Sequence, residues 1–318
     1  MQKSKKQARI HRPVLVSEVN HALKLKELAH LKSRARVIDA TVGVGGHSSE
    51  FVKAGVFVLG IDADPEMSII AKERLSKACP PPLDRRKSAA TSRGCFKLLL
   101  GNFKDIDKLS KLAGIDNVNG VIFDLGQTSI QLTSKKRGFS FSHPKSQLDM
   151  RLNPKVQKIT ASDLLNSLRE DQLRDLFEKT LRRDEARKIA KEIIKRRLDR
   201  PFRKVRDFSE VSEKLIRPKA NIRPATRPFL AVRIAVNSEL VNLAESLPNA
   251  FGLLKKTGRL AVISFHSGED SIVKNFYKEQ KKQNKARIIT KKPIVPSPEE
   301  IQANFRARSA KLRVLEKL

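Results

Sequence analysis

The chain of 318 residues is long enough for one large domain or two smaller ones, and its 39% hydrophobic residues suffice for a folded core. Its formal net charge is +32, from 66 Lys and Arg against 34 Asp and Glu. This charge favours a polyanionic partner, because each neutralised phosphate releases counterions; the alternative is a surface that is merely well solvated. With no Trp and one Tyr, the composition disfavours recognition through many stacked aromatic rings.

The chain has no apolar run of 18 residues and no apolar leader, so we expect a cytoplasmic protein without a membrane partner. A basic start at residues 3–12 is either an RNA-contacting arm or a disordered one. Cys79 and Cys95 show neither metal-ligand spacing nor a disulfide framework, so we expect two reduced thiols.

Apolar strands alternate with helices over the first 125 residues, which predicts an α/β fold with a mostly parallel sheet. We expect helices near 17–25, 48–54 and 65–77, a proline-rich surface loop at 80–94, and strands at 37–40, 57–62, 96–100 and 121–125. Further strands are predicted at 259–265, 287–290 and 311–317, with a short helix from Pro298. Late antiparallel strands at a sheet edge are typical of methyltransferases that use S-adenosylmethionine (AdoMet).

A glycine-rich turn follows the first strand, and Asp62 ends the second strand 23 positions after Asp39. Glycine lets backbone N–H groups approach a ligand closely, and an acid at this spacing suits the hydroxyls of a ribose. The pattern lacks the third glycine of a dinucleotide turn, because position 48 is Ser, and it lacks the Gly-Lys of a P-loop. Asp39 ahead of the glycines suits a positively charged cofactor, which favours AdoMet over NAD.

The alternation of strands and helices stops after Asp124-Leu-Gly126 and resumes at residue 259. A crossover helix near 229–251 fills part of this gap, and the rest has helical patterns. Ser167-Leu-Arg-Glu170 predicts a capping box, and apolar residues recur at helical spacing from Ala186 to Ile194. We therefore predict an inserted all-helical substrate-recognition domain at 127–223, within an AdoMet-dependent methyltransferase domain formed by 1–126 and 224–318.

The inserted domain holds the densest positive charge, with 12 basic and 4 acidic residues between positions 182 and 206. A charge run is usually a solvated helix face, but in a chain of this net charge we favour RNA contact. We assign RNA binding to Arg137, Lys195, Arg196 and Arg197.

Motifs spread from residue 11 to residue 313 resemble those of the RsmH (MraW) family, the 16S ribosomal RNA cytosine-N4 methyltransferases. The most specific are Arg137-Gly-Phe-Ser-Phe141, Leu148-Asp-Met-Arg151 and Val262-Ile-Ser-Phe-His-Ser267. The others are His11-Arg-Pro-Val-Leu15, Asp39-Ala-Thr-Val-Gly-Val-Gly-Gly-His47, Pro224-Ala-Thr-Arg227, Asn237-Ser-Glu-Leu240 and Arg306-Ala-Arg-Ser-Ala-Lys-Leu-Arg313.

The resemblance implies a class I methyltransferase fold with a helical insertion after the fourth strand. It implies methylation of a cytidine at the decoding centre, with ribosomal RNA in the small subunit as the partner. It also implies that AdoMet contacts Gly45, Gly46, His47, Asp62, Phe103, Asp124 and Gln131. Departures from the family pattern at Gln127, Arg182, Arg183, Leu230 and Gly268 cluster near the substrate side.

The implied reaction is displacement of the sulfonium methyl by a cytosine amine whose lone pair is delocalised, so in-line positioning supplies much of the acceleration. Asp124 is our catalytic candidate as acceptor of the amine proton, with the Leu125 carbonyl as an alternative. A different RNA or DNA target, or a non-catalytic RNA- or ribosome-binding protein that retains AdoMet, are the rival hypotheses. The histidines show no metal-ligand spacing, so we expect no metal. The oligomeric state stays open, a homodimer included.

Overall fold

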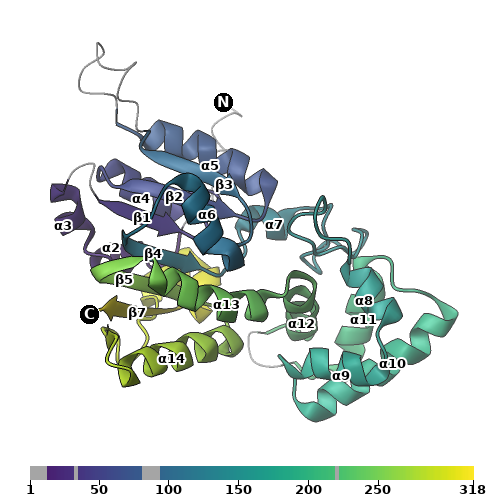
Figure 1. The fold of residues 1–318 in the computed structure, drawn as a ribbon. Helices are drawn as coiled ribbons and strands as arrows, with labels where there is room; N and C mark the ends of the chain where they lie inside the picture. Colours follow the sequence, from purple (N-terminus) through teal and green to yellow (C-terminus); the bar gives the residue numbers. More distant parts are fainter. Residues whose placement is uncertain (1–12, 32–34, 81–93, 219–221) are drawn as a thin grey trace. The chain divides into compact units, whose positions relative to one another are not determined.

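The computed structural model describes residues 13–31, 35–80, 94–218 and 222–318 (Figure 1). The basic start at 3–12 lies outside the described residues, and so does nearly all of the predicted surface loop at 80–94. The chain divides into two compact units. One comprises Met1–Gln127 and Val241–Leu318, and the other is Thr128–Leu240.

The first unit is built on a seven-stranded sheet with the order β3-β2-β1-β4-β5-β7-β6. The first five strands in this order run parallel to one another, and β7 is antiparallel to both β5 and β6. The strands are β1 (Arg36–Asp39), β2 (Phe57–Asp62), β3 (Phe96–Leu100), β4 (Val118–Asp124), β5 (Leu254–Ser264), β6 (Ala286–Ile288) and β7 (Lys311–Lys317). All seven strands expected from the sequence are present.

Helices cover both faces of this sheet, because successive side chains of a strand point to opposite sides. Val37 packs in one apolar cluster with Phe51, and its neighbour Ile38 packs in another with Leu243. The helices are α2 (Val16–Ala22), α3 (Leu25–His30), α4 (Gly46–Lys53), α5 (Pro65–Ala78), α6 (Ile106–Ala113), α13 (Glu239–Gly252), α14 (Ser267–Lys282) and α15 (Pro298–Ala303). Over the described residues, no helix is both long and apolar enough to cross a membrane.

The expectation of two reduced thiols is wrong, because Cys79 and Cys95 form a disulfide. Cys79 caps the C-terminus of α5, and Cys95 lies directly before β3. Since α5 packs against β3, two residues 16 positions apart bring their Cα atoms within 5.9 Å. Spacing in the sequence does not reveal this disulfide, because the disulfide depends on how the end of α5 packs beside the start of β3.

The described part of the second unit is helical and has a core rich in phenylalanine. The ring of Phe208 stacks on those of Phe177 and Phe229, with centroid distances of 6.0 and 4.9 Å. The expected apolar face of the basic helix is confirmed, since Ala186 and Ile189 are fully buried in this core. The helices are α7 (Ser129–Thr133), α8 (Ala161–Ser167), α9 (Glu170–Glu178), α10 (Arg183–Asp199), α11 (Val205–Leu215) and α12 (Thr226–Asn237).

The predicted capping box at Ser167-Leu-Arg-Glu170 is wrong. Ser167 is the last residue of α8, and α9 begins only at Glu170. The side chain that satisfies the start of α9 is Gln172, whose Oε1 accepts the Arg169 N–H at 3.0 Å. The same sequence pattern can therefore span the junction between two helices, where the serine closes one helix instead of opening the next.

The single crossover helix expected near 229–251 is instead two helices, α12 and α13. Ser238 separates them in a left-handed conformation, with φ of 50°. Phe229 and Val232 of α12 pack into the phenylalanine-rich core, so the helical unit extends to residue 240 rather than to 223. Helical periodicity alone misses a one-residue break of this kind.

Replacing Arg227 by methionine should destabilise the helical unit. Both Nη atoms of Arg227 donate to the Glu185 carboxylate at 2.7 Å, and only 14% and 11% of the two side chains are exposed. Arg227→Met leaves a buried carboxylate without this partner, so we expect a loss of about 3 kcal/mol in the free energy of unfolding, measured in urea by circular dichroism. Arg227→Met with Glu185→Met should recover most of the loss.

Arg174→Met is the matched control, because it breaks the exposed Arg174–Asp175 pair and should change stability little. Equal losses for the buried and the exposed pair would contradict this prediction.

Candidate active site

Three carboxylates end three neighbouring strands of the sheet. Asp39, Asp62 and Asp124 are the last residues of β1, β2 and β4. Because these strands are parallel and adjacent in the order β2-β1-β4, their carboxyl ends meet at one edge. The order of connection reverses between β1 and β4, which is where open α/β sheets bind ligands.

The glycine turn after β1 is held in place by Asp62. Its Oδ2 accepts the Gly43 N–H at 2.7 Å, and its Oδ1 accepts the Asp64 N–H at 2.8 Å. Gly43 and Gly45 have φ of 52° and 76°, left-handed values that glycine adopts without strain. The turn is therefore shaped by the same carboxylate that the sequence assigns to a ribose. Each oxygen retains capacity for a further donor.

Gly46 is required for a close approach by the segment before α2. A Cβ at this position would lie 2.9 Å from the Cβ of Pro13. That segment is fixed in turn by α15, because Glu300 Oε1 accepts the Leu15 N–H at 2.8 Å. The start of the described chain thus packs directly over the glycine turn.

Asp39 stabilises the glycine turn through hydrogen bonds to residues on both sides of it. Its Oδ2 accepts the Ser48 hydroxyl at 2.6 Å, and its Oδ1 accepts the Thr41 N–H at 3.2 Å. Burial raises the pKa of Asp39 to about 6, and the Ser48 hydrogen bond limits the rise. The sequence motifs did not indicate these roles of Thr41 and Ser48. A hydroxyl residue close in sequence to a buried acid could have suggested a hydrogen bond between them.

Thr41 also connects the turn to the fourth strand. Its Oγ1 accepts the backbone N–H of Asp124 at 2.6 Å. The end of β4 is therefore tied to the same turn that Asp39 and Asp62 organise. Thr41 is a positioning residue for Asp124.

Asp124 combines burial with an unsatisfied oxygen. Its Oδ1 is buried and has no hydrogen-bond partner of ordinary geometry among the described residues, while Oδ2 lies 3.7 Å from Nε2 of His47. Burial, and then the charge of Asp39, raise the pKa of Asp124 to about 7, although the nearby Gly126 N–H lowers it. Burial also raises the pKa of Asp62 to about 7. A buried oxygen without a partner needs a hydrogen-bond donor. The negative charges of Asp39, Asp62 and Asp124 favour a donor that is positively charged.

His266 and Glu269 border this edge, and motif reading gave them no role. Glu269 Oε2 accepts the Phe265 N–H at 2.7 Å and the His266 N–H at 3.3 Å. His266 Nδ1 accepts the Glu269 N–H at 3.4 Å, and Nε2 lies 3.1 Å from Glu269 Oε1. This reciprocal cap fixes the start of α14 beside β4, since Asp124 pairs with Ile263 in the sheet. The sequence offered one signal for this cap, because Glu269 stands three residues after the polar residue His266, as in a capping box.

Phe103 lies at the start of a short 3-10 helix, η3 (Phe103–Asp105), directly after β3. Its ring meets that of Phe123 edge to face, with a centroid distance of 5.7 Å. One edge of Phe103 is thus fixed by β4. Contact of its remaining surface with adenine is still a prediction.

Gln131 and the predicted RNA-binding residues belong to the helical unit. Gln131 Oε1 accepts the Thr128 N–H at 3.0 Å, which caps α7. Arg137 is buried and donates to the Leu152 carbonyl at 3.3 Å. Arg196 pairs with Glu210 at 2.5 Å, and Arg197 donates to the Leu168 carbonyl at 2.6 Å. These three arginines serve the fold of the unit, and of the four only Lys195 is exposed.

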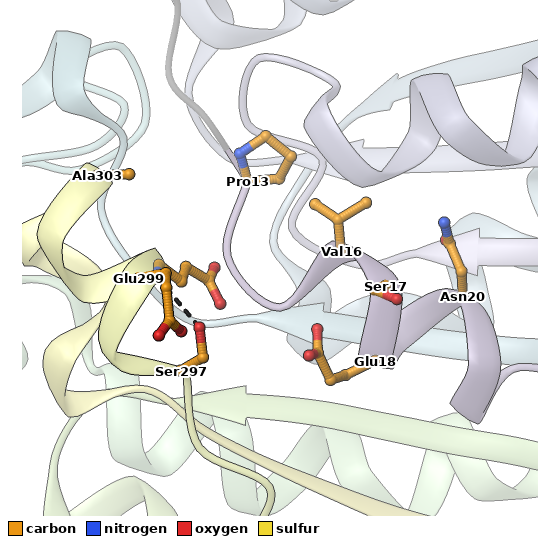
Figure 2. Close-up of a pocket in the computed structure, with 9 residues that line it drawn as sticks. Pro13, Val16, Ser17, Glu18, Asn20, Ser297, Glu299 and Ala303 are labelled. Atoms are coloured by element: carbon orange, nitrogen blue, oxygen red, sulfur yellow. Dashed lines mark hydrogen bonds between the residues drawn. The ribbon is translucent and has the colours of Figure 1, made fainter.

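A separate pocket lies between the start of α2 and α15 (Figure 2). Its lining includes Pro13 and Val16 on one side and Ser297 and Ala303 on the other. Glu18 and Glu299 make it acidic, and the Ser297 hydroxyl lowers the pKa of Glu299. Pro13 thus borders this pocket and also touches the glycine turn.

The sheet order, the glycine turn and the acids at the strand ends define a class I methyltransferase that uses AdoMet. Residues 8–318 match the model of the MraW methylase family, so this chain belongs to that family. The ribosomal RNA small subunit methyltransferase H of Dictyoglomus thermophilum is 39% identical over 311 residues, covering 97% of each chain. The protein of that name from Carboxydothermus hydrogenoformans is 39% identical, covering 97% of this chain and 98% of its own.

Among solved structures, a putative methyltransferase from Streptococcus mutans in complex with SAH aligns at 16% identity and a TM-score of 0.43, covering 93% of this chain and 96% of that one. An rRNA methylase from Streptococcus thermophilus aligns at 13% identity and a TM-score of 0.42, covering 93% and 95%.

The chemistry of the site fits AdoMet, which supplies an electrophilic methyl group and a net positive charge. Asp62 can accept from its ribose hydroxyls, because each of its oxygens has capacity beside its backbone hydrogen bond. Contact of Gly45 and Gly46 with its methionine end stays a prediction, since side chains at these positions would face Leu75 and Pro13. Asp124 offers a buried oxygen that still needs a donor. His47 stands beside Asp124 and is itself only 4% exposed.

AdoMet should bind more tightly as pH rises from 6 to 8. A carboxyl group with a pKa near 7 is mostly protonated at pH 6 and attracts the cation only once it ionises. For one such proton lost on binding, Kd should fall about tenfold over this range, as measured by isothermal titration calorimetry. S-adenosylhomocysteine lacks the sulfonium charge and should show a weaker dependence.

Asp124→Asn should remove part of the pH dependence and leave the contribution of Asp62. Identical pH profiles for the wild type and this variant would show that Asp124 does not face the cation.

Proposed function

We propose that this protein transfers the methyl group of AdoMet to the exocyclic N4 of a cytidine in small-subunit (16S) ribosomal RNA, at the decoding centre, in the cytoplasm. The observation that carries the proposal is Asp124, a buried carboxylate at the end of β4 with an unsatisfied oxygen and a pKa near 7. Similarity to ribosomal RNA small subunit methyltransferases supports the ribosomal RNA substrate. The resemblance of the motifs supports cytosine N4.

Asp124 would act on the amine. The N4 lone pair is delocalised into the cytosine ring, and a hydrogen bond from N4–H to Asp124 Oδ1 would localise it on nitrogen. Bound AdoMet would supply the methyl group, whose bond to sulfur would break as the bond to N4 forms, with the electron pair left on sulfur. The N4 proton would then pass to the carboxylate of Asp124, whose raised pKa suits a base that works near neutral pH.

Positioning of Asp124 is as important as its basicity. Thr41 holds its backbone N–H, and Phe265 packs where a side chain on Gly126 would otherwise lie, 2.7 Å from the Cβ that glycine lacks. The end of β4 is therefore fixed from two sides before any substrate arrives. Such pre-organisation lowers the entropic cost of an in-line approach.

The exposed face of α10 supports binding of the RNA backbone. Arg183, Arg187, Lys191 and Lys195 follow one another at four-residue intervals and are all exposed. Residues four apart lie on one side of a helix, so these cations form a stripe that can follow phosphates. Arg137, Arg196 and Arg197 have partners within the fold, and their contact with RNA stays a prediction.

A methyl-transfer assay tests the proposed reaction. Small ribosomal subunits from cells lacking this gene, and free 16S rRNA, would be incubated with labelled AdoMet, and the product nucleoside identified by mass spectrometry. We expect N4-methylcytidine from the wild type and a loss of at least about a hundredfold in rate with Asp124→Asn. AdoMet binding without transfer to either substrate, or a different methylated nucleoside, would overturn the proposal.

Neutralising the stripe should weaken RNA binding and reduce the dependence of that binding on salt. For Arg187→Ala with Lys191→Ala, we expect the negative slope of log K against log salt for a 16S rRNA fragment to become less steep by about 2. Lys281→Ala with Lys282→Ala, on α14, removes the same charge from exposed positions and should leave the slope nearly unchanged. Equal effects of the two double variants would contradict a localised contact on α10.

A further inference from the structure

A second exposed cationic segment lies at the catalytic edge of the sheet. The 3-10 helix η4 (Phe305–Ser309) leads directly into β7, whose first residue, Lys311, pairs with Ser264 at the end of β5. On the other side of β5, Ile263 pairs with Asp124. Since β7 begins where β5 ends, η4 is placed at the same edge as the catalytic carboxylate.

Two small residues of this segment pack against the core. Ala307 and Ala310 are fully buried in the apolar cluster that contains Leu312, and their N–H groups donate to the Asn304 and Ala307 carbonyls at 2.8 Å. The side chains between and before them are exposed. The backbone is thus fixed, and it presents Phe305, Arg306 and Arg308 outward.

Phe305 is an unusual surface residue. The residue is 60% exposed, and it is the only aromatic among the large exposed hydrophobic residues in the described part of the chain. The guanidinium carbon of Arg308 lies 4.3 Å from the ring centroid. A surface aromatic ring flanked by arginines suits a base and its phosphate.

We propose that Phe305, Arg306 and Arg308 form a binding site for an unpaired nucleotide of RNA adjoining the target cytidine. This inference rests on the proposed function. A base that enters the catalytic site must leave its stack, which deprives its neighbour of a stacking partner. The Phe305–Arg308 pair replaces that partner, and Arg306 neutralises the adjoining phosphate. The positive charge of the segment favours RNA over a protein as the occupant.

The test uses the full chain with S-adenosylhomocysteine and a single-stranded RNA of about ten nucleotides, with a central cytidine flanked by 5-iodouridine. We expect Phe305→Ala to raise the Kd from fluorescence anisotropy about five- to tenfold, and Phe305→Leu to give the same rise, since leucine keeps apolar area but no aromatic face. Irradiation should cross-link the wild type at Phe305. Arg308→Ala should weaken binding more than Lys282→Ala.

Ile69→Ala, at an exposed position of α5, is the matched control for loss of apolar surface. Unchanged RNA affinity in Phe305→Ala, or cross-links only elsewhere, would overturn this inference. So would a variant that binds the oligonucleotide normally but methylates assembled subunits poorly, which would indicate a protein contact. If the wild type methylates subunits but binds no oligonucleotide, this nucleotide site is refuted and the proposed function is not.

Discussion

Burial of three like charges at one edge of the sheet is the constraint on which the site depends. Asp39, Asp62 and Asp124 all have pKa values well above 3.8 because burial disfavours their charged forms. Since the unfolded chain releases these protons at lower pH, the free protein loses stability as pH rises from about 4 to 7. A cationic ligand that ionises the same groups recovers that free energy. The site is therefore least stable when empty at neutral pH, which favours cofactor binding.

Backbone hydrogen bonds keep this crowded edge ordered. Asp62 accepts the Gly43 N–H, and Thr41 accepts the Asp124 N–H, so each link joins one strand end to the turn after β1. The turn can take this shape because glycine permits a positive φ at Gly43 and Gly45. Loss of either link would disturb two strand ends at once, which explains why hydroxyl and carboxylate groups outside the motif positions matter here.

The sequence predicted the strands, the glycine turn and the helical insertion, because apolar periodicity and glycine spacing are local properties. It did not predict the disulfide of Cys79 and Cys95, which depends on the packing of α5 against β3. It did not predict that Arg196 pairs with Glu210 and that Arg197 donates to the Leu168 carbonyl, since charge alone does not distinguish a free cation from one with a partner inside the fold. Ser238 was missed for a related reason, because a single left-handed residue leaves the helical pattern on both sides intact.

The protein must satisfy two opposite electrostatic demands. A net charge of +32 attracts RNA, yet the same field repels a cationic cofactor. Grouping carboxylates at the strand ends resolves the conflict locally, because buried charges interact strongly at short range while solvent screens the distant lysines and arginines. In the proposed function, the exposed cations of α10 and η4 act on phosphates while the acids act on the sulfonium. Release of protons from these acids on binding would link cofactor affinity to pH.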